Sequence, residues 1–167
     1  CQHSERPIVV KWMLPPEPFI KLNTDASVKN GIGGGGGVCC SSKGDFIFAF
    51  TCQLGNVSVL QAESRSLLHG LEICISKGYK KIVIETDSLV LSSIINRQCH
   101  IPWSVFYTIK KIHRLQETGV YQVQHCYREV NGPADYLANM AIDGQSQMIE
   151  FETVSYTHLT LPTTPYV

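Results

Sequence analysis

Hydrophobic and polar side chains alternate over residues 19–25 (FIKLNTD), which predicts a strand, because successive side chains of a strand point to opposite faces of its sheet. The turn-forming sequence SKGD at 42–45 predicts a hairpin between two further strands, at 38–42 and 46–54. Six glycines among residues 31–37 predict a loop and the start of a strand, which continues as the first of these two strands. Together these segments predict an antiparallel meander of three strands.

After the third strand, the apolar residues recur at intervals of three and four positions. This spacing predicts a long helix from residue 59 to residue 77, which Gly78 would end as its C-terminal stop. The nearly continuous apolar run KIVIET at 81–86 is typical of a central strand covered on both faces. The remaining pattern predicts a short helix, a longer helix, a strand and a closing helix, at residues 88–96, 102–118, 121–128 and 133–142.

The order of these elements predicts an α/β fold. Three antiparallel strands come first, and two more strands follow helices, so right-handed crossovers should place them parallel to the first strand. We therefore expect a mixed five-stranded sheet flanked by helices. Residues 1–17 are polar and proline-rich and predict an extended leader, residues 18–150 form the domain, and residues 151–167 predict a tail that is either disordered or not native to the gene.

Composition adds limits to this picture. With 167 residues, 44% hydrophobic and 17% charged, the chain suits one globular domain. No apolar run approaches the length of a membrane span, no signal peptide is visible, and the seven cysteines form no C-x-x-C pair. We therefore expect reduced thiols in an intracellular protein, in the nucleus or the cytoplasm, and the first residue, Cys1, suggests a piece of a longer chain. The formal net charge of zero means that any nucleic-acid-binding surface must be local.

Four carboxylates lie where the predicted elements could direct them to one point: Asp25, Glu63, Asp87 and Asp135. Asp25 and Asp87 follow two parallel strands, whose carboxyl ends meet at one edge of a sheet. Glu63 shares a helix face with Leu67 and other apolar residues, where an unpaired charge is costly to bury. Two such charges about 4 Å apart repel by about 4 kcal/mol at an effective dielectric near 20, so their convergence predicts a divalent cation.

Each carboxylate also has a purely structural interpretation. Glu63 and Asp135 would be favoured by the dipole in the first turn of a helix. Asp87 before a helix is a good N-cap, and Asp25 could be a solvated strand end. The joint arrangement, rather than any one position, favours a site.

The residues around these carboxylates resemble ribonuclease H. The likeness lies in Asp-Ala-Ser after an apolar strand, the glycine run, Ala-Glu in the long helix, Thr-Asp-Ser after the fourth strand and Asn-x-x-x-Asp-x-Leu-Ala in the last helix. It extends from about residue 12 to residue 142 and is greatest to plant ribonuclease H-like domains related to non-LTR retrotransposon reverse transcriptases.

The resemblance implies a metal-dependent endonuclease that hydrolyses the RNA strand of RNA/DNA hybrids and leaves 5′-phosphate ends. It implies that Asp25, Glu63, Asp87 and Asp135 are catalytic and hold two Mg²⁺ or Mn²⁺ ions around the scissile phosphate. The partner would be the hybrid, with no membrane involved, and the domain would be a monomer or part of a larger reverse-transcriptase polyprotein. The alternative is a catalytically weak or inactive nucleic-acid-binding module derived from a retroelement.

Further candidates for nucleic-acid contacts are Asn30, Asn131, Lys110 and Lys111. Asn131 could equally cap the last helix, and a basic cluster on a helix is often only a solvated face. The glycine run could admit a nucleic-acid backbone, but a flexible hairpin loop is the simpler interpretation.

One departure from the family is a missing histidine loop, which many members carry before the final helix. Only residues 129–132 separate the last predicted strand from that helix, and Glu129 is a candidate substitute. His125 falls inside the predicted strand, where we expect it to be packed. Trp103 and Phe106 are expected to lie in the core.

Overall fold

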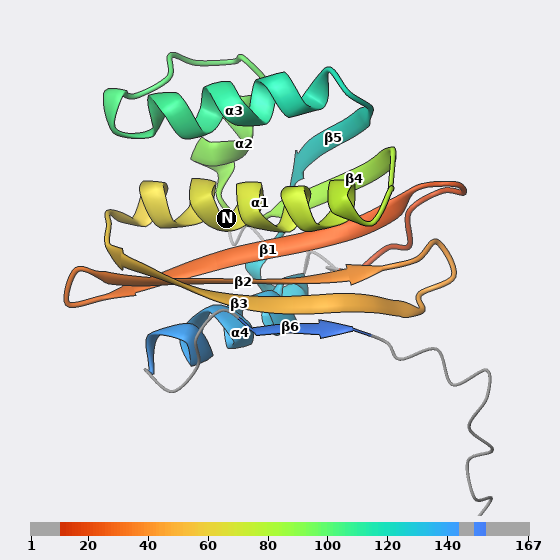
Figure 1. The fold of residues 1–167 in the computed structure, drawn as a ribbon, viewed down its shortest axis with the longest axis horizontal. Helices are drawn as coiled ribbons and strands as arrows, with labels where there is room; N and C mark the ends of the chain where they lie inside the picture. The colour runs from red at the N-terminus through yellow and green to blue at the C-terminus, as the bar shows by residue number, and fades with distance from the viewer. Residues whose placement is uncertain (1–10, 144–148, 153–167) are drawn as a thin grey trace, which may run out of the picture.

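The computed structural model describes residues 11–143 and 149–152. A mixed sheet with the order β5-β4-β1-β2-β3-β6 forms its centre. The strands are β1 (Ile20–Lys29), β2 (Ile32–Cys40), β3 (Phe46–Asn56), β4 (Lys81–Thr86), β5 (Val120–His125) and β6 (Ile149–Glu152). The helices are α1 (Val59–Ser76), α2 (Leu89–Ile95), α3 (Phe106–Gln116) and α4 (Gly132–Ile142), with short 3-10 turns η1 (Trp103–Val105) and η2 (Arg128–Val130). Helices α1, α2 and α3 lie on one side of the sheet and α4 on the other (Figure 1).

The strand directions confirm the predicted topology. β1, β2 and β3 pair antiparallel, whereas β4 pairs parallel to β1 and β5 parallel to β4. The last matched pair of β1 and β4 is Thr24 with Thr86, so Asp25 and Asp87 follow neighbouring strands near the same edge.

The structure extends the predicted sheet by a sixth strand. β6 pairs antiparallel with β3 over four residue pairs, and it takes in residues 151–152, which the sequence assigned to the tail. Four residues are too few for a periodic pattern to show. The rest of the predicted tail, 153–167, and residues 1–10 of the leader lie outside the described part of the chain.

The structure places more of the glycine run in a strand than the sequence predicted. Gly33 to Gly37 lie inside β2, and the turn between β1 and β2 needs only Asn30 and Gly31, both with positive φ. A Cβ at Gly36 would lie 2.6 Å from the backbone nitrogen of Ala138 in α4. The glycines therefore allow close packing of helices on the sheet, not flexibility.

Two other predicted elements differ in their ends. The predicted helix over 102–118 consists of η1 followed by α3, and the strand predicted to reach residue 128 ends at His125. The apolar core lies between the sheet and α1, α2 and α3, with Leu22, Phe50 and Leu67 among its fully buried side chains. Among the described residues no helix has the length and apolar character needed to cross a membrane.

Candidate active site

Three of the four predicted carboxylates form a tight group. Ligand oxygens of Asp25, Glu63 and Asp87 all lie within 4.8 Å of one another. β1 supplies Asp25, α1 supplies Glu63, and Asp87 follows β4 directly. The parallel pairing of β1 with β4, and the packing of α1 on the sheet, bring these distant positions together.

Asp135 joins the group from the opposite side of the sheet. It lies in the first turn of α4 and lines the same pocket of about 290 Å³ as Asp25, Glu63 and Asp87. Its carboxyl group interacts with Asp25 both through charge and through a side-chain hydrogen bond. The structure thus brings all four predicted residues to one pocket, with Asp135 outside the tight group of three.

The structural interpretations of two carboxylates do not hold. Ser88, not Asp87, caps α2, because its hydroxyl accepts a hydrogen bond from the Leu91 amide. No acidic residue lies in the first turn of α1, where Ser58 forms a capping box with Gln61. The positions of Glu63 and Asp87 therefore need another explanation than helix stability.

The electrostatics of the pocket indicate negative charge that the chain leaves unbalanced. Burial, and then the charge of Asp87, raise the pKa of Asp25 to about 8, although the Ala26 amide lowers it. Burial also raises the pKa of Glu63, against a hydrogen bond from Ser88 that lowers it. Both shifts are those expected of carboxylates that share a desolvated site.

This donor set fits a divalent cation. Carboxylate oxygens are the ligands that Mg²⁺ and Mn²⁺ prefer, and the charge of a bound cation would favour the ionised carboxylates that burial and mutual repulsion disfavour. Arg128 in η2 also lines the pocket, and among the described residues it is the basic side chain that does so.

A buried hydroxyl fixes the backbone of Asp25. Ser66 of α1 donates a hydrogen bond from Oγ to the carbonyl oxygen of Asp25 (2.7 Å) and accepts one from the Gly36 amide (3.1 Å). Because Ser66 is fully buried, α1 is held to β1 and β2 at the position of the site.

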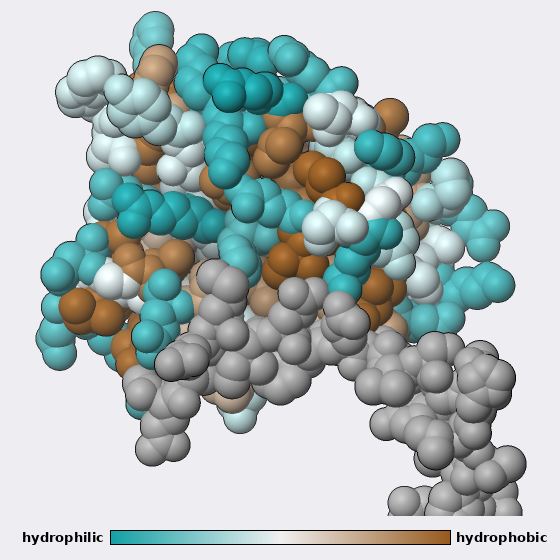
Figure 2. Space-filling model, viewed as in Figure 1, coloured by the Kyte–Doolittle hydropathy of each residue, from teal (hydrophilic) through white to brown (hydrophobic). Residues whose placement is uncertain are grey.

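The predicted nucleic-acid contacts lie in different places. Asn30 is exposed in the β1–β2 turn, about 17 Å along the strand from Asp25 at 3.4 Å per residue. Lys111 pairs with Glu72 of α1 (2.9 Å), and the Lys110 ammonium lies 5.5 Å from the centre of the Phe106 ring. The outer surface over α3 is largely hydrophilic (Figure 2).

Asn131 does not fit the role of a nucleic-acid contact. Its side chain is fully buried, donates from Nδ2 to the carbonyl oxygen of Thr24 (3.0 Å) and accepts from Asn23 Nδ2 (3.2 Å). It is the N-cap residue of α4, as one interpretation expected, but its side chain makes no capping hydrogen bond there. The partners of that side chain lie on β1, which neither interpretation included.

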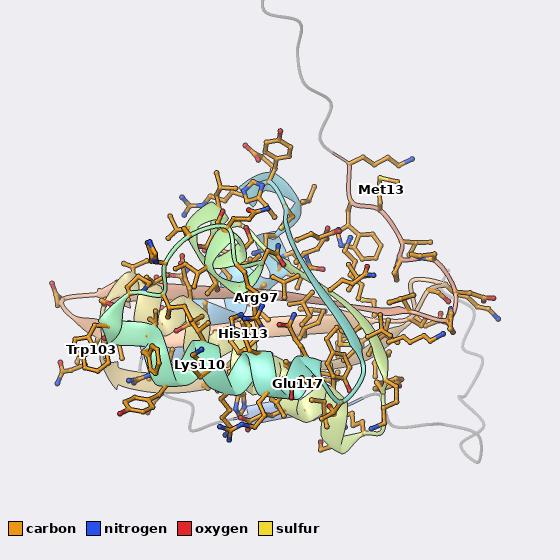
Figure 3. The ribbon with its side chains drawn as sticks, turned by 90° about the horizontal axis from the view of Figure 1, so that it is seen from above. Met13, Arg97, Trp103, Lys110, His113 and Glu117 are labelled. Carbon is orange, nitrogen blue, oxygen red and sulfur yellow. The ribbon has the colours of Figure 1, made fainter. Side chains whose placement is uncertain are left out.

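Three further expectations need correction. His125 is exposed at the end of β5 and meets the ring of Tyr127, because the strand ends there. Trp103, at the start of η1, is 81% exposed. Figure 3 shows it away from Lys110, which lies further along in α3. Arg128 rather than Glu129 lines the acidic pocket. Arg128 is the basic residue between β5 and Asp135, so its position in the sequence could have identified it as a site residue.

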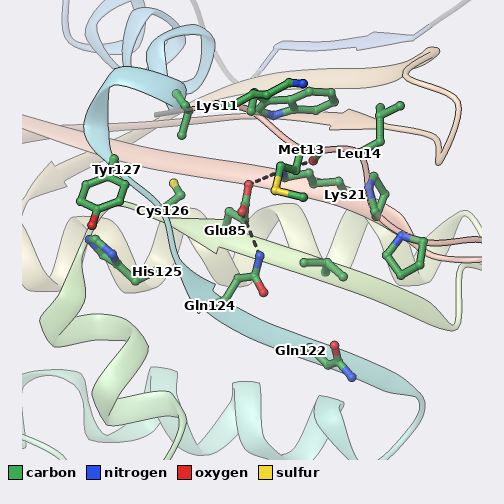
Figure 4. Close-up of a pocket in the computed structure, with 15 residues that line it drawn as sticks. Lys11, Met13, Leu14, Lys21, Glu85, Gln122, Gln124, His125, Cys126 and Tyr127 are labelled. Atoms are coloured by element: carbon green, nitrogen blue, oxygen red, sulfur yellow. Dashed lines mark hydrogen bonds and ion pairs between the residues drawn. The ribbon is translucent and has the colours of Figure 1, made fainter. Parts of the chain in front are cut away.

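A larger pocket of about 480 Å³ lies away from the four carboxylates. Residues 11–16 and the face of β5 line it, and a buried ion pair between Lys21 and Glu85 forms its floor (Figure 4). Gln124 donates a second hydrogen bond to Glu85 (2.9 Å). Lys21 and Glu85 neutralise each other, and Lys11 adds a positive charge to the lining, so this pocket lacks the negative charge of the acidic site.

Comparison with known proteins agrees with this geometry. The model of the reverse transcriptase-like family matches residues 23–141. The chain is 28% identical over 136 residues to the Arabidopsis thaliana protein named "Putative ribonuclease H protein At1g65750", covering 80% of this chain but only 22% of that relative's length.

Solved structures show the same fold. Ribonuclease H1 from Halobacterium salinarum NRC-1 has a TM-score of 0.73 at 21% identity, over 76% of this chain and 99% of its own. The LC11 ribonuclease H1, solved in complex with an RNA/DNA hybrid, has a TM-score of 0.70 at 22% identity, over 74% of this chain and 96% of its own. The chain therefore belongs to the reverse transcriptase-like family and forms a ribonuclease H-like domain.

Proposed function

We propose that this domain is a metal-dependent endonuclease that hydrolyses the RNA strand of RNA/DNA hybrids. The observation that carries the proposal is the convergence of four carboxylates, from four separate segments of the chain, on one pocket. The fold supports it, because a structural neighbour was solved with such a hybrid. Since the chain spans about a fifth of its Arabidopsis relative, we also propose that it is one part of a longer polyprotein.

Asp25, Glu63, Asp87 and Asp135 are the residues that would hold the metal. Two Mg²⁺ or Mn²⁺ ions would supply the charge that lowers the pKa of the attacking water and stabilises the leaving 3′-oxygen. Because the pKa of Asp25 is raised to about 8, its carboxyl group carries a proton near neutral pH without a cation. Asp25 must release that proton when it becomes a ligand.

Arg128 would bind the substrate. In the proposed hydrolysis, a water oxygen bonds to phosphorus while the bond to the 3′-oxygen breaks, and the proton that the water loses is balanced by protonation of the leaving 3′-oxygen, which leaves a 5′-phosphate and a 3′-hydroxyl. Arginine stays protonated and so cannot serve as the base. Its guanidinium beside the pocket can instead donate paired hydrogen bonds to the nonbridging phosphate oxygens. We propose this role for Arg128 in place of the one considered for Glu129.

Selection of RNA would rest on the 2′-hydroxyl groups, which a hybrid displays in its shallow minor groove. Lys110 and Asn30 are exposed and stay candidates for contacts with the duplex outside the pocket. With a net charge of zero, the chain must concentrate such contacts rather than spread them.

Cleavage of a hybrid labelled on its RNA strand tests the proposal. We expect wild type to cut the RNA in Mg²⁺ but not in EDTA, and Asp87→Asn to be inactive while folded. Asp45→Asn, an exposed aspartate in the β2–β3 turn, is the matched control and should cut like wild type. A folded wild type that binds the hybrid but cuts neither strand in Mg²⁺ or Mn²⁺ would contradict the proposal and support a non-catalytic binding module.

A further inference from the structure

Two asparagines flank Asp135 along α4, one four residues before it and one four residues after it. Residues four apart lie on the same face of a helix, so Asn131, Asp135 and Asn139 form one row. The Asp135 amide donates a hydrogen bond to the carbonyl oxygen of Asn131 (3.1 Å), so this bond belongs to the first turn of the helix.

Asn131 joins the start of α4 to β1 just before Asp25. Its Nδ2 donates to the carbonyl oxygen of Thr24 (3.0 Å), and its Oδ1 accepts from Asn23 Nδ2 (3.2 Å). Asn23 also donates towards Glu85 (3.4 Å), so the contact belongs to a buried polar network across β1 and β4. The start of α4 is thereby fixed against the strand that carries Asp25.

Asn139 makes the matching contact just beyond Asp25. Its Oδ1 accepts a hydrogen bond from Ser27 Oγ (3.0 Å). Its Nδ2 donates to Asp135 twice, to the backbone oxygen (2.9 Å) and to the carboxylate Oδ1 (3.3 Å). The side chain thus contacts both β1 and the carboxylate, and the two asparagines reach β1 on either side of Asp25.

Helix stability does not account for this pair. Asparagine has a low helix propensity, yet Asn139 lies inside α4, and the side chain of the N-cap residue Asn131 makes no capping hydrogen bond. Docking of α4 on the sheet does not require the asparagines either, because Gly34 and Gly36 already let the helix approach closely. What the pair adds is a defined position and rotamer for Asp135.

We propose that Asn131 and Asn139 are positioning residues that act through Asp135. They hold its carboxylate next to Asp25, so that both side chains can bind the same divalent cations. The inference rests on the proposed function, since it takes those cations to be the cofactor of the nuclease. Loss of a hydrogen-bond partner of a metal ligand typically weakens metal affinity by about 10- to 100-fold.

A double-mutant cycle on Mn²⁺ affinity tests the proposal without nucleic acid. Isothermal titration calorimetry would compare wild type, Asn139→Ala, Asp135→Asn and the double variant. We expect Asn139→Ala to weaken Mn²⁺ binding about tenfold when Asp135 is present and less than about twofold when residue 135 is asparagine. Asn139 is only half-buried, so its alanine variant should fold.

Asn96→Ala is the matched control. Asn96 also makes a side-chain hydrogen bond to a backbone carbonyl, that of Val123 (2.9 Å), but it lies at the end of α2. Its variant should bind Mn²⁺ like wild type. The positioning role would be overturned if Asn139→Ala weakened Mn²⁺ binding equally whether residue 135 is aspartate or asparagine. It would also be overturned if Asn139→Ala left Mn²⁺ affinity unchanged in the protein that retains Asp135.

Cleavage kinetics give a second measurement, which would not change if Asn139 had only a structural role. With the hybrid as substrate, Asn139→Ala should lower kcat and raise the Mn²⁺ concentration needed for half-maximal activity. KM for the hybrid should stay within about twofold of wild type, because Asn139 acts on the metal ligand rather than on the duplex. A wild type that cuts no hybrid yet shows the Mn²⁺ cycle would refute the nuclease alone. If wild type cuts the hybrid but the double-mutant cycle shows no coupling between Asn139 and Asp135, the positioning role alone would be refuted.

Discussion

Asp25 on β1 lies directly opposite Gly36 on β2. A Cβ at Gly36 would lie 2.6 Å from both the Ala138 nitrogen and the Leu137 Cβ of α4. The missing side chain therefore lets α4 lie against the sheet beside Asp25. Because Asp135 is in the first turn of α4, its distance from Asp25 depends on this glycine.

The first prediction follows from that contact. Gly36→Ala should force α4 away from β2 and lower the free energy of unfolding by about 1–3 kcal/mol, as other overpacked cores do. It should also weaken Mn²⁺ binding, because Asp135 moves with the helix. Urea denaturation and calorimetry measure the two effects.

Gly132→Ala is the control for this substitution. Gly132 begins α4, and a Cβ there would have no atom within 4 Å. We expect it to leave stability and Mn²⁺ affinity nearly unchanged. If Gly36→Ala behaved in the same way, the close approach of α4 would not be what places Asp135.

The sequence predicted those parts of the site that follow from strand direction. Asp25 and Asp87 come together because two parallel strands end at one edge, and this follows from the order of the elements alone. Glu63 could be placed because a charge on an apolar helix face needs a partner.

The errors concern contacts between elements that no local pattern contains. Gly34 and Gly36 of β2 looked like part of a loop because their partner, α4, lies about 100 residues further along the chain. Asn131 looked like a surface contact because the partners of its buried side chain, Asn23 and Thr24, are on β1. Trp103 was expected in the core on hydrophobicity alone, but η1 leaves it exposed.

The second prediction concerns the buried ion pair between Lys21 and Glu85. Their side chains are only 3% and 9% exposed, and Lys21 also donates to the carbonyl oxygen of Met13. Lys21→Met would leave the Glu85 carboxylate buried without its cation, so the free energy of unfolding should fall by about 3–5 kcal/mol. Adding Glu85→Gln should recover part of this loss, because the neutral amide is cheaper to bury.

Urea denaturation of the single and double variants checks this prediction. Lys111→Met provides the contrast, because it removes an exposed ion pair with Glu72 and should cost less than about 1 kcal/mol. Similar losses for Lys21→Met and Lys111→Met would show that burial does not strengthen the dependence of Glu85 on Lys21.

The third prediction is a pH dependence that arises at Asp25. Its pKa is raised from 3.8 to about 8, so the folded state favours the protonated carboxyl group. The contribution of this group to stability is therefore fully present below about pH 4 and is lost as the pH rises through about 8. In EDTA, the Tm of wild type should fall over this range relative to that of Asp25→Asn.

Mg²⁺ should oppose this loss, because a cation binds the deprotonated form. We expect Mg²⁺ to raise the Tm of wild type more at pH 8.5 than at pH 6, and to have a smaller effect on Asp25→Asn at both pH values. Thermal scans in EDTA and in Mg²⁺ measure both differences. A constant difference in Tm between wild type and Asp25→Asn across the range would contradict the raised pKa.

The last prediction separates substrate binding from metal binding at Arg128. Arg128→Gln should weaken binding of the hybrid about tenfold, which corresponds to a charge-assisted hydrogen bond of about 1.5 kcal/mol. The slope of log Kd against log salt should fall by about one, because one phosphate contact is lost. Mn²⁺ affinity without nucleic acid should stay equal or increase, since the substitution removes a positive charge from the acidic pocket.

Lys43→Gln, which changes an exposed lysine in the β2–β3 turn, is the control and should change none of these quantities. A loss of Mn²⁺ affinity in Arg128→Gln with unchanged hybrid binding would show that Arg128 supports the carboxylates rather than the phosphate.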